Sequence, residues 1–559
     1  MSESIMIGKV QYVDTGNVSI RIEKDEYVNS VQVNQIIQIN SSKTNEKIIG
    51  LVTKILRKTS PVDEEIDNVE AGFENTIKVN LVGTLKGREG TRAHVFKRTL
   101  NTVPSLDAEC FLLQGEELSG FMKAISSDST NPLTIGKYTM SEDSIANLDG
   151  NKFFQRHAVI VGGTGSGKSW TVATILEKAS ELKSANVVVF DIHGEYAPLK
   201  GLSNAKQLKI AGPGEKPENE RAIFLPYWLL SYEEMAAMLL DRSDSNAPNQ
   251  SRALFDLILK EKRSTVQGED DWNTDANLTV ESPIPYKIQD VLSELKRQDV
   301  EMIPGARGDK QGPLNGKLTR FIQRLESKIA DKRLNFLFND GPDLLAYNWL
   351  TQLLDKILGY GDKNGIKIID FSEVPSDILP LITGLIGRLV FTVQQWTNDA
   401  DRHPIALFCD EAHLYLPAIA NDNMDERGLK SFERIAKEGR KYGVALVVIS
   451  QRPADVSKTI LSQCGNFIAM RLSNPEDQNV IRRLFPDNLG DFAEMLPILD
   501  VGEALVVGDA SLLPSRVALD KPRICPNSST VDFWDMWSEE RKSSTLGNVV
   551  KALRQQQKS

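Results

Sequence analysis

Apolar and polar residues alternate over short stretches near the start of the chain, which predicts strands with one buried face. The alternating stretches cover residues 18–22, 31–33, 37–39 and 77–81. The first of them follows a turn-forming segment at 14–17, so the two together predict a hairpin. Several short strands separated by turn residues favour a small β-barrel over residues 1–145. The acidic segment 61–75 is predicted to be an exposed loop.

Longer apolar runs without alternation follow, and they predict strands buried on both faces of a parallel sheet. These runs cover residues 158–161, 187–190, 366–369, 405–409, 444–449, 467–470 and 504–507. Residues 213–345 interrupt the series with helical apolar spacing at 232–240, 252–259 and around Leu318, Ile322 and Leu325. A polar stretch at 264–282 is predicted to be a loop. We therefore predict an α/β core with a mainly helical insertion.

The run 158–161 leads directly into a glycine-rich turn and then into an apolar-periodic helix. Residues Gly162 to Ser169 fit the pattern G-x-x-x-x-G-K-S in the strand–loop–helix setting of a phosphate-binding P-loop. Glycines let backbone N–H groups approach a phosphate, and the new helix points its N-terminus at the same charge. We expect Lys168 to bridge the β- and γ-phosphates and Ser169 to ligate Mg²⁺. The predicted nucleotide contacts are Gly163, Thr164, Gly165, Ser166, Gly167, Lys168, Ser169 and Trp170.

The run 405–409 ends in two adjacent acids, Asp410 and Glu411. Two carboxylates after an apolar strand are costly to bury unless they have partners. In P-loop enzymes a carboxylate at such a strand end helps to hold Mg²⁺, and a second one can activate the attacking water. Asp410 is therefore a candidate metal ligand, and Glu411 is a candidate general base.

Three further polar positions have roles that the pattern leaves open. Asp191 begins the motif DIHGEY, which is typical either of a ligand-binding strand end or of a helix-capping turn. Gln451 follows the run 444–449 and either senses the γ-phosphate or caps the strand end. Arg440 follows a glycine at a predicted helix end, where it is either solvated or donated to a neighbouring subunit's ATP.

Composition narrows the class of protein. The 559 residues carry a formal net charge of −10, which argues against a globally basic nucleic-acid binder but not against a local basic surface such as a pore. The four cysteines match no metal or disulfide spacing, and we see no targeting segment. The apolar run 378–391 contains Arg388 and is too short to cross a bilayer, so it predicts a buried helix. These features predict a cytoplasmic protein with no membrane association.

Six segments together resemble the HerA family of hexameric DNA translocases, in the FtsK/HerA branch of RecA-like P-loop ATPases. They read GGTGSGKSW, DIHGEY, LPYWLLS, FCDEAHLYLP, RIAKEGRKYGV and ISQRP. The resemblance covers nearly the whole chain. It implies a RecA-like core with an N-terminal barrel, assembled as a homohexamer with ATP between subunits and double-stranded DNA in the central channel.

The resemblance also implies roles for single residues. It supports those given above for Lys168, Ser169, Asp410 and Glu411. It adds Gln451 as the sensor, Arg440 as the arginine acting on the neighbour's ATP, with Arg434 as a competitor, and Arg156 as an arginine near the subunit interface. The implied domains are a barrel at 1–145, a core at 146–212 and 346–525, an insertion at 213–345 and a tail at 526–559.

The function implied is an ATP-hydrolysing motor that moves on double-stranded DNA. Such motors work with a nuclease, which suits DNA end processing, or with a nuclease or sirtuin-like effector in antiphage defence. Two alternatives stay open: an ATP-regulated scaffold that controls an effector without moving, and a secretion or conjugation ATPase. The tail carries Phe533, Trp534 and Trp537, which either anchor it on a neighbouring subunit or pack on its own core.

Overall fold

The structure is a computed structural model, and the chain in it divides into two compact units. It describes residues 5–43, 45–59, 73–87, 94–100, 102–125, 131–141, 143–268, 277–306, 308–359, 365–420, 423–528, 531–539 and 546–555. The first unit combines Met1–Ala179, Val447–Ala454 and Leu461–Arg523. The second combines Ser180–Leu446, Asp455–Ile460 and Ile524–Ser559. Each unit is therefore assembled from segments that are far apart in the sequence.

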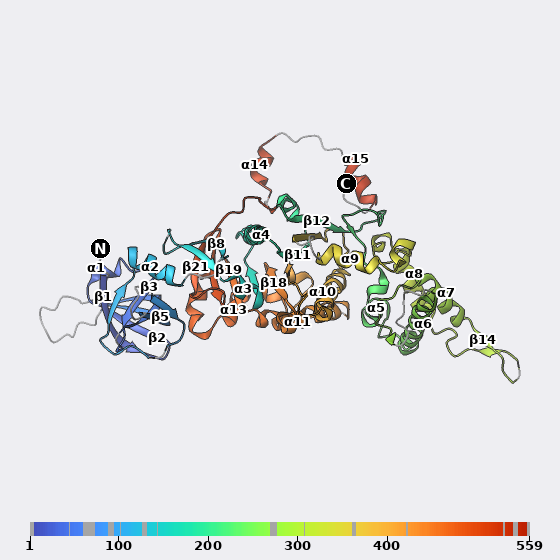
Figure 1. The fold of residues 1–559 in the computed structure, drawn as a ribbon, viewed down its shortest axis with the longest axis horizontal. Coiled ribbons are helices and arrows are strands. Elements are labelled where there is room, and N and C mark those ends of the chain that lie inside the picture. Colours follow the sequence, from blue (N-terminus) through green and yellow to red (C-terminus); the bar gives the residue numbers. More distant parts are fainter. Residues whose placement is uncertain are drawn as a thin grey trace. The chain divides into compact units, whose positions relative to one another are not determined.

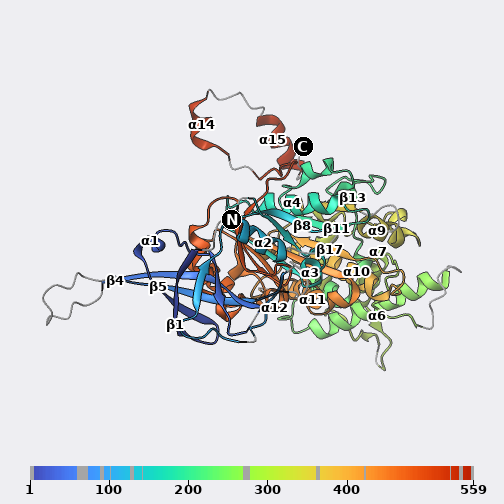
Figure 2. The same ribbon diagram turned by 60° about the vertical axis from the view of Figure 1, so that its left-hand side comes forward.

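The first unit begins with an antiparallel β-barrel (Figures 1 and 2). Its strand order is β2-β1-β7-β3-β4-β5-β6, and an additional pairing of β2 with β5 closes the sheet on itself. The strands are β1 Ile5–Val13, β2 Asn17–Ile22, β3 Ile36–Asn40, β4 Glu46–Thr59, β5 Phe73–Gly87, β6 His94–Lys97 and β7 Glu109–Leu112. Two helices accompany them, α1 Asp25–Val28 and α2 Gly115–Ile125. The predicted barrel is confirmed.

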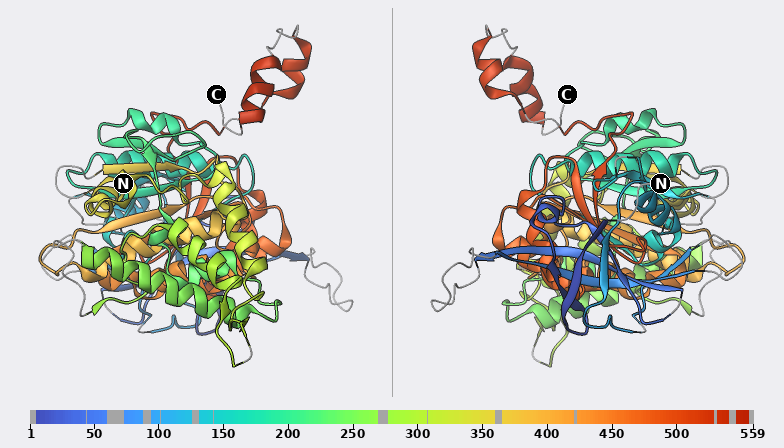
Figure 3. Two further views of the ribbon diagram at one scale, coloured as in Figure 1. Left: turned by 90° about the vertical axis from the view of Figure 1, so that its right-hand side faces the viewer. Right: turned by 90° about the vertical axis from the view of Figure 1, so that its left-hand side faces the viewer.

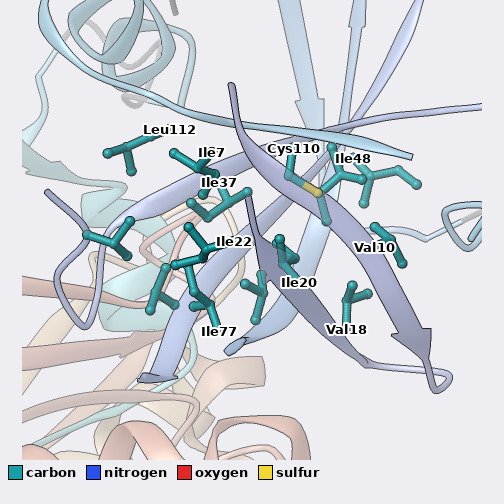
Figure 4. Close-up of a cluster of buried hydrophobic side chains, with 14 of the residues drawn as sticks. Ile7, Val10, Val18, Ile20, Ile22, Ile37, Ile48, Ile77, Cys110 and Leu112 are labelled. Carbon is teal, nitrogen blue, oxygen red and sulfur yellow. The ribbon is translucent and has the colours of Figure 1, made fainter. Parts of the chain in front are cut away.

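Alternating side chains fill the interior of this barrel. In β2, Val18, Ile20 and Ile22 are buried, while the residues between them are exposed or half-buried. Figure 4 shows apolar side chains from several strands converging on one core, among them Ile7, Val10, Ile37, Ile48, Ile77, Cys110 and Leu112. The closing pair β2–β5 lets these side chains share a single core, as expected for a small closed barrel.

Two predictions for the barrel region need correction. Residues 31–33 are not a strand, because Val33 and Asn34 form a turn and Asn34 takes a left-handed φ of 76°. Val31 is nevertheless buried in the barrel core, so its alternation indicated burial and not a strand. The predicted acidic loop 61–75 lies outside the described residues up to position 72, and residues 73–75 belong to β5.

Beyond the barrel, the first unit holds a mixed sheet ordered β18-β10-β19-β20-β21-β8-β9. β10 lies parallel to both β18 and β19, and the remaining neighbours pair antiparallel. The strands are β8 Leu133–Tyr138, β9 Ile145–Leu148, β10 Ala158–Val161, β18 Val444–Ser450, β19 Asn466–Met470, β20 Glu503–Gly508 and β21 Ser515–Leu519. The helices are α3 Gly150–Gln155, α4 Lys168–Ser180, α12 Lys458–Gln463 and α13 Pro475–Leu484.

The second unit holds a parallel sheet ordered β13-β12-β16-β11-β17. Its strands are β11 Asn186–Asp191, β12 Ala205–Ile210, β13 Ala222–Ile223, β16 Gly365–Asp370 and β17 Ile405–Cys409. Every residue of β11 and β17 is buried, as the continuous apolar runs predict.

Short 3₁₀ helices connect elements of both units. They are η1 Ala197–Gly201, η2 Tyr227–Leu229, η5 Lys332–Leu334, η6 Pro342–Leu345, η8 Ala412–Leu414, η9 Gly439–Tyr442, η10 Pro453–Asp455 and η11 Asp487–Ile498.

The insertion is mainly helical, as predicted (Figure 3, green and yellow helices). Its elements are α5 Tyr232–Leu239, α6 Ala247–Gly268, α7 Ile288–Asp299, the hairpin β14 Met302–Ile303 and β15 Lys310–Gln311, and α8 Thr319–Ala330, with α9 Trp349–Leu358 after it. The prediction of a loop from 264 is wrong up to 268, since α6 continues there. Val266 is buried, and Thr265 Oγ1 donates to the carbonyl of Glu261, so packing holds this polar turn in the helix.

Long helices α10 Leu379–Trp396 and α11 Asn423–Glu438 complete the second unit, and α10 is the buried helix expected from the apolar run. Arg388 in α10 donates to the buried carboxylate of Glu234 in α5 and to the carbonyl of Leu229. Among the described helices, none is long and apolar enough to cross a membrane.

The tail contains α14 Phe533–Ser538 and α15 Leu546–Gln555. Neither helix buries any residue, and Trp534 and Trp537 are strongly exposed. The alternative in which these aromatic side chains pack on the chain's own core is therefore wrong for the described part of the tail.

Helices α10 and α11 approach each other at two glycines. A Cβ added to Gly428 would overlap the carbonyl of Pro380, and one added to Gly384 would overlap the Cα of Gly428. Backbones this close leave no room for a methyl group, so the contact requires glycine at both positions.

We predict that Gly428→Ala lowers the free energy of unfolding by about 1–3 kcal/mol, the usual cost of overpacking a core contact. Gly120→Ala in α2 is the matched control. Nothing lies within 4 Å of its added Cβ, so alanine there raises stability by up to about 1 kcal/mol through helix propensity. Denaturant unfolding of both variants measures this, and equal midpoints for the two variants would contradict it.

Candidate active site

The glycine-rich turn between β10 and α4 has the geometry of a phosphate cradle. Gly163 N donates to the carbonyl of Arg471 (2.8 Å), and Ser166 N donates to the carbonyl of Gly163 (3.2 Å). Gly165 and Gly167 take left-handed φ values of 74° and 104°, which side chains with a Cβ rarely adopt. These two hydrogen bonds and the two glycines therefore hold the turn in a fixed conformation that passes through left-handed backbone angles.

Gly162 is required for a steric reason. An added Cβ would overlap Ser166 Oγ and would lie 2.8 Å from the Cβ of Met470. Ser166 is buried and its hydroxyl donates to Met470 Sδ (3.5 Å), so neither neighbour is free to move aside. At Gly163 the nearest atom to an added Cβ is the carbonyl oxygen of Arg471 at 3.4 Å, an ordinary contact.

The charged end of this loop fits a triphosphate. Lys168 is the first residue of α4 and is buried, so a cationic residue stands at the helix N-terminus. Both features favour an anion. The tip at Thr164 and Gly165 is exposed, and nothing lies within 4 Å of a Cβ built on Gly165. The residues predicted to cradle phosphate therefore form an open, positively polarised loop.

Gln451 reaches this loop. Its Oε1 accepts a hydrogen bond from Thr164 Oγ1 (2.8 Å), although the two residues are 287 positions apart in the sequence. A side chain that only capped its own strand end would not need this contact. The geometry therefore favours the sensor alternative for Gln451, a role that stays a proposal.

Asp410 and Glu411 follow β17 in the second unit, and they are only 1 % and 2 % exposed. Glu411 takes left-handed backbone angles, φ 44° and ψ 44°, which cost a non-glycine residue about 1–3 kcal/mol and cluster at functional sites. Its carboxylate lies 3.4 Å from His413 Nδ1. Two buried carboxylates and a strained backbone therefore lie at the end of β17, and neighbouring groups must stabilise both.

Asp191 ends β11, and its carboxylate accepts the backbone N–H groups of Glu195 and Tyr196, each at 2.9 Å. Asp191 therefore holds the turn of the DIHGEY motif but does not cap the helix after it, because Tyr196, the N-cap of η1, has no side-chain cap hydrogen bond. Burial raises the pKa of Asp191 to about 7, opposed by the N–H of Tyr196 and reinforced by the carboxylates of Asp410 and Asp370. Asp191 thus holds the turn and also feels the charges of Asp410 and Asp370.

Sequence reasoning noted Asp370 only as a strand end and gave Tyr196 no role beyond its place in the motif. Tyr196 is fully buried, and burial together with the charge of Asp410 raises its pKa well above the ordinary range. The sequence did contain a signal that these acids lie together. Asp191, Asp370 and Asp410 each follow an apolar run, and parallel strands bring such residues to one edge of the sheet.

The three candidate arginines differ in their surroundings. Arg434 is engaged within its own unit, with its guanidinium 4.6 Å from the Phe391 ring centroid and a hydrogen bond to Gln395 Oε1 (3.1 Å). Arg440 in η9 is exposed. Arg156 is half-exposed and forms an ion pair with Asp509 (3.4 Å). All three arginines are exposed, and Arg434 and Arg156 have the contacts named above within the chain.

The sequence matches the family described as "Helicase HerA, central domain" over residues 133–390 and "Helicase HerA-like C-terminal" over 385–556. The chain belongs to the HerA family. It is 29% identical over 492 residues to a protein of Sulfurisphaera tokodaii named "DNA double-strand break repair helicase HerA", covering 85% of this chain and 86% of that protein. A protein of the same name from Saccharolobus solfataricus is 27% identical over 516 residues, covering 90% and 91% of the two chains.

A solved structure of VirB4 from Thermoanaerobacter pseudethanolicus is also similar, with a TM-score of 0.47 and 14% identity, covering 71% of this chain and 99% of that one. The α/β fold and the P-loop in a HerA-family chain make this protein an ATP-hydrolysing enzyme.

We predict that Gly162→Ala weakens ATP binding by about ten-fold or more, because the methyl group displaces Ser166 or Met470 and distorts the loop. The adjacent Gly163→Ala is the control, since its methyl group has room. Calorimetric titration with ATP compares the two variants. Similar affinity losses in both would show that the steric contact at Gly162 does not set the loop geometry.

Proposed function

We propose that this HerA-family helicase is an ATP-driven ring motor that translocates on double-stranded DNA and works with a nuclease or another effector. The hydrogen bond that joins Thr164 of the P-loop to Gln451 carries the proposal, because it links the phosphate loop to a second polar strand end. A P-loop alone binds nucleotide, whereas a polar group that contacts its tip can follow the γ-phosphate.

The cofactors are ATP and Mg²⁺. The open loop at Gly163–Gly167, with Lys168 buried at the start of α4, fits the phosphates. We assign Ser169 and Asp410 to the metal, because a hydroxyl and a carboxylate are the oxygen ligands that Mg²⁺ uses in P-loop enzymes. The ion neutralises charge on the β- and γ-phosphates when bound.

Glu411 is the proposed general base. Its buried carboxylate beside His413 and its left-handed backbone angles support the assignment, since such strain is kept where a side chain must be aimed. We propose that Asp410 and Glu411 act on the nucleotide that the P-loop holds. Gln451 then reports the state of the γ-phosphate to the loop.

A ring places one subunit's surface against the next subunit's nucleotide. We propose a homohexamer in which Arg440 acts on the neighbouring ATP, supported by its exposure and by the engagement of Arg434 with Phe391 and Gln395. Arg156, paired with Asp509, is a secondary interface candidate.

The partner and setting are proposals of the same kind. HerA-like motors suit DNA end processing with a nuclease, or antiphage defence with a nuclease or sirtuin-like effector. Duplex DNA is the expected track, bound through its phosphates. We keep the domain limits 1–145, 146–212 with 346–525, 213–345 and 526–559 as a proposal, together with a cytoplasmic location.

Triplex displacement tests the proposed motor. The wild-type chain is expected to displace a third strand from duplex DNA when ATP is present. Glu411→Gln is the matched variant: it keeps ATP binding but hydrolyses ATP about 10²–10⁴-fold more slowly, because the base is missing, and it displaces nothing. ATP hydrolysis by the wild type without displacement would instead indicate a scaffold whose assembly ATP controls.

We predict that Arg440→Ala folds, assembles and binds ATP but hydrolyses it on the order of a thousand-fold more slowly, the scale of a lost arginine finger. Lys168→Ala is inactive for a different reason, since it loses the charge that holds the phosphates. Mixing the two variants is expected to restore activity at interfaces that combine an intact P-loop with an intact arginine.

The readout is the ATPase rate against mixing ratio, after subunit exchange has been confirmed. Arg434→Ala serves as the comparison and is expected to retain more activity than Arg440→Ala. A flat line at the level of the separate variants, despite exchange, would mean that Arg440 acts within its own subunit or not at all.

A further inference from the structure

One outer surface of the barrel gathers exposed cations from several strands. The side chains of Val10, Ile20 and Ile77 lie in the barrel core (Figure 4). Because successive residues of a strand point to opposite faces, the residues that alternate with them in β1, β2 and β5 point outward. The outward residues of these strands and of β4 therefore form one side of the barrel surface.

Cross-strand pairing arranges these outward residues in two adjoining rows. The first row crosses β1, β2, β5 and β4 and consists of Tyr12, Ser19, Lys78 and Lys54. In the second row Arg21 lies beside Thr76. Ser19 is half-buried, whereas the tyrosine and the three cations are exposed. We call Tyr12, Ser19, Arg21, Lys54 and Lys78 the basic face.

Two cations of the basic face oppose each other. Lys54 of β4 and Lys78 of β5 are directly opposite across the strand pair. Like charges in this arrangement destabilise a sheet. Another charged pair of the same two strands is matched, since Glu46 lies opposite Lys86 and forms an ion pair with it (3.3 Å). The repulsion between Lys54 and Lys78 is therefore kept at a cost to the barrel.

The third cation of the face also lies beside another cation. Arg21 of β2 is opposite Lys9 of β1. Lys9 is compensated, because it forms an ion pair with Glu23 (3.6 Å). Within the described parts of the chain, the charged groups of Arg21, Lys54 and Lys78 form no ion pair or hydrogen bond. The three cations of the basic face are thus available to an external anion.

The chemistry of the basic face fits a phosphate backbone. Lysine, arginine, serine and tyrosine side chains are among those that contact DNA phosphates, and the face contains all four types. The whole chain carries a net charge of −10, so it needs a local basic surface to attract DNA. A protein partner would instead bury a core of apolar side chains. In the two rows Tyr12 and the half-buried Leu56 lie on the outermost strands and form no such core.

We propose that the basic face binds the phosphate backbone of duplex DNA without reading its sequence. The partner follows from the proposed function of a motor on duplex DNA, on which this assignment rests. The face gives the barrel a contact with the DNA track in addition to its structural role. Because phosphates carry no sequence information, a motor can keep such a contact at every step.

The test measures how full-length protein binds a short labelled duplex at a series of salt concentrations, by fluorescence anisotropy. The double variant Lys54→Gln/Lys78→Gln is expected to bind on the order of ten-fold more weakly. Its slope of log affinity against log salt is expected to fall by about two, since each lost phosphate contact removes about one. Two duplexes of unrelated sequence are expected to be affected equally. Lys97→Gln, at an exposed lysine of β6 outside the two rows, is the matched control and is expected to bind like the wild type.

A second measurement separates binding from stability. Lys78→Gln removes the repulsion with Lys54, so its denaturant midpoint is expected to equal or exceed that of the wild type while its DNA binding weakens. A residue that only held the barrel together would lower the midpoint as well.

The outcomes are distinct. Unchanged affinity and salt slope in the double variant overturn the basic face. Binding to polyglutamate that is lost in the double variant, with DNA binding unchanged, would assign the face to an acidic protein and overturn the proposal too. If the wild type displaces no triplex but the double variant still binds DNA more weakly, the proposed motor fails and the basic face stands.

Discussion

Burial of β10, β11 and β17 on both faces leaves the ends of these three strands as the places for their charged groups. β10, β11 and β17 have no exposed residue along their length, so a charged group within them would lose its hydration without compensation. Loops that follow such strands can hold charge because helix N-termini, backbone N–H groups and bound ions can compensate it. The P-loop follows β10, Asp191 ends β11, and Asp410 with Glu411 follow β17. Burial along these strands therefore accounts for the positions of the P-loop, Asp191, Asp410 and Glu411, but not for those of Arg156 and Arg440.

The same constraint explains why so much could be predicted from the sequence. The apolar runs at 158–161, 187–190, 366–369 and 405–409 coincide with β10, β11, β16 and β17, because no other element buries so short a run on all sides. Errors arose where burial had another cause. Val31 is buried from a turn, and residues 264–268 stay helical because Val266 packs into the core although its neighbours are polar. The local sequence pattern indicates that a residue is buried. Tertiary packing determines whether that residue lies in a strand, a helix or a turn.

The candidate site likewise has a part that could be predicted from local sequence and a part that could not. A P-loop is a local motif, so Gly163 to Ser169 could be named without a structure. Contacts between residues far apart in the sequence could not be predicted without a structure. The proposal of Arg440 over Arg434 depends on the ring of Phe391 and the amide of Gln395 in α10. The proposed sensor role of Gln451 depends on its hydrogen bond with Thr164. Neither of these contacts produces a periodic pattern of apolar and polar residues in the sequence. Position along strands did give one signal, since Asp191, Asp370 and Asp410 all follow apolar runs and all contribute to the same electrostatic environment.

The electrostatic environment of Asp191 determines how its buried carboxylate is stabilised. Burial, with a smaller contribution from neighbouring carboxylates, raises the pKa of Asp191 to about 7, so near neutrality Asp191 itself lies close to a change of protonation. Hydrogen bonds from the backbone of Glu195 and Tyr196 oppose this shift, but they satisfy Asp191 alone. Asp370 is held in the same way, since its Oδ1 accepts the backbone N–H of Ser372 (2.8 Å). Backbone donors at the strand ends are therefore what allows buried acids to lie beside one another in this unit.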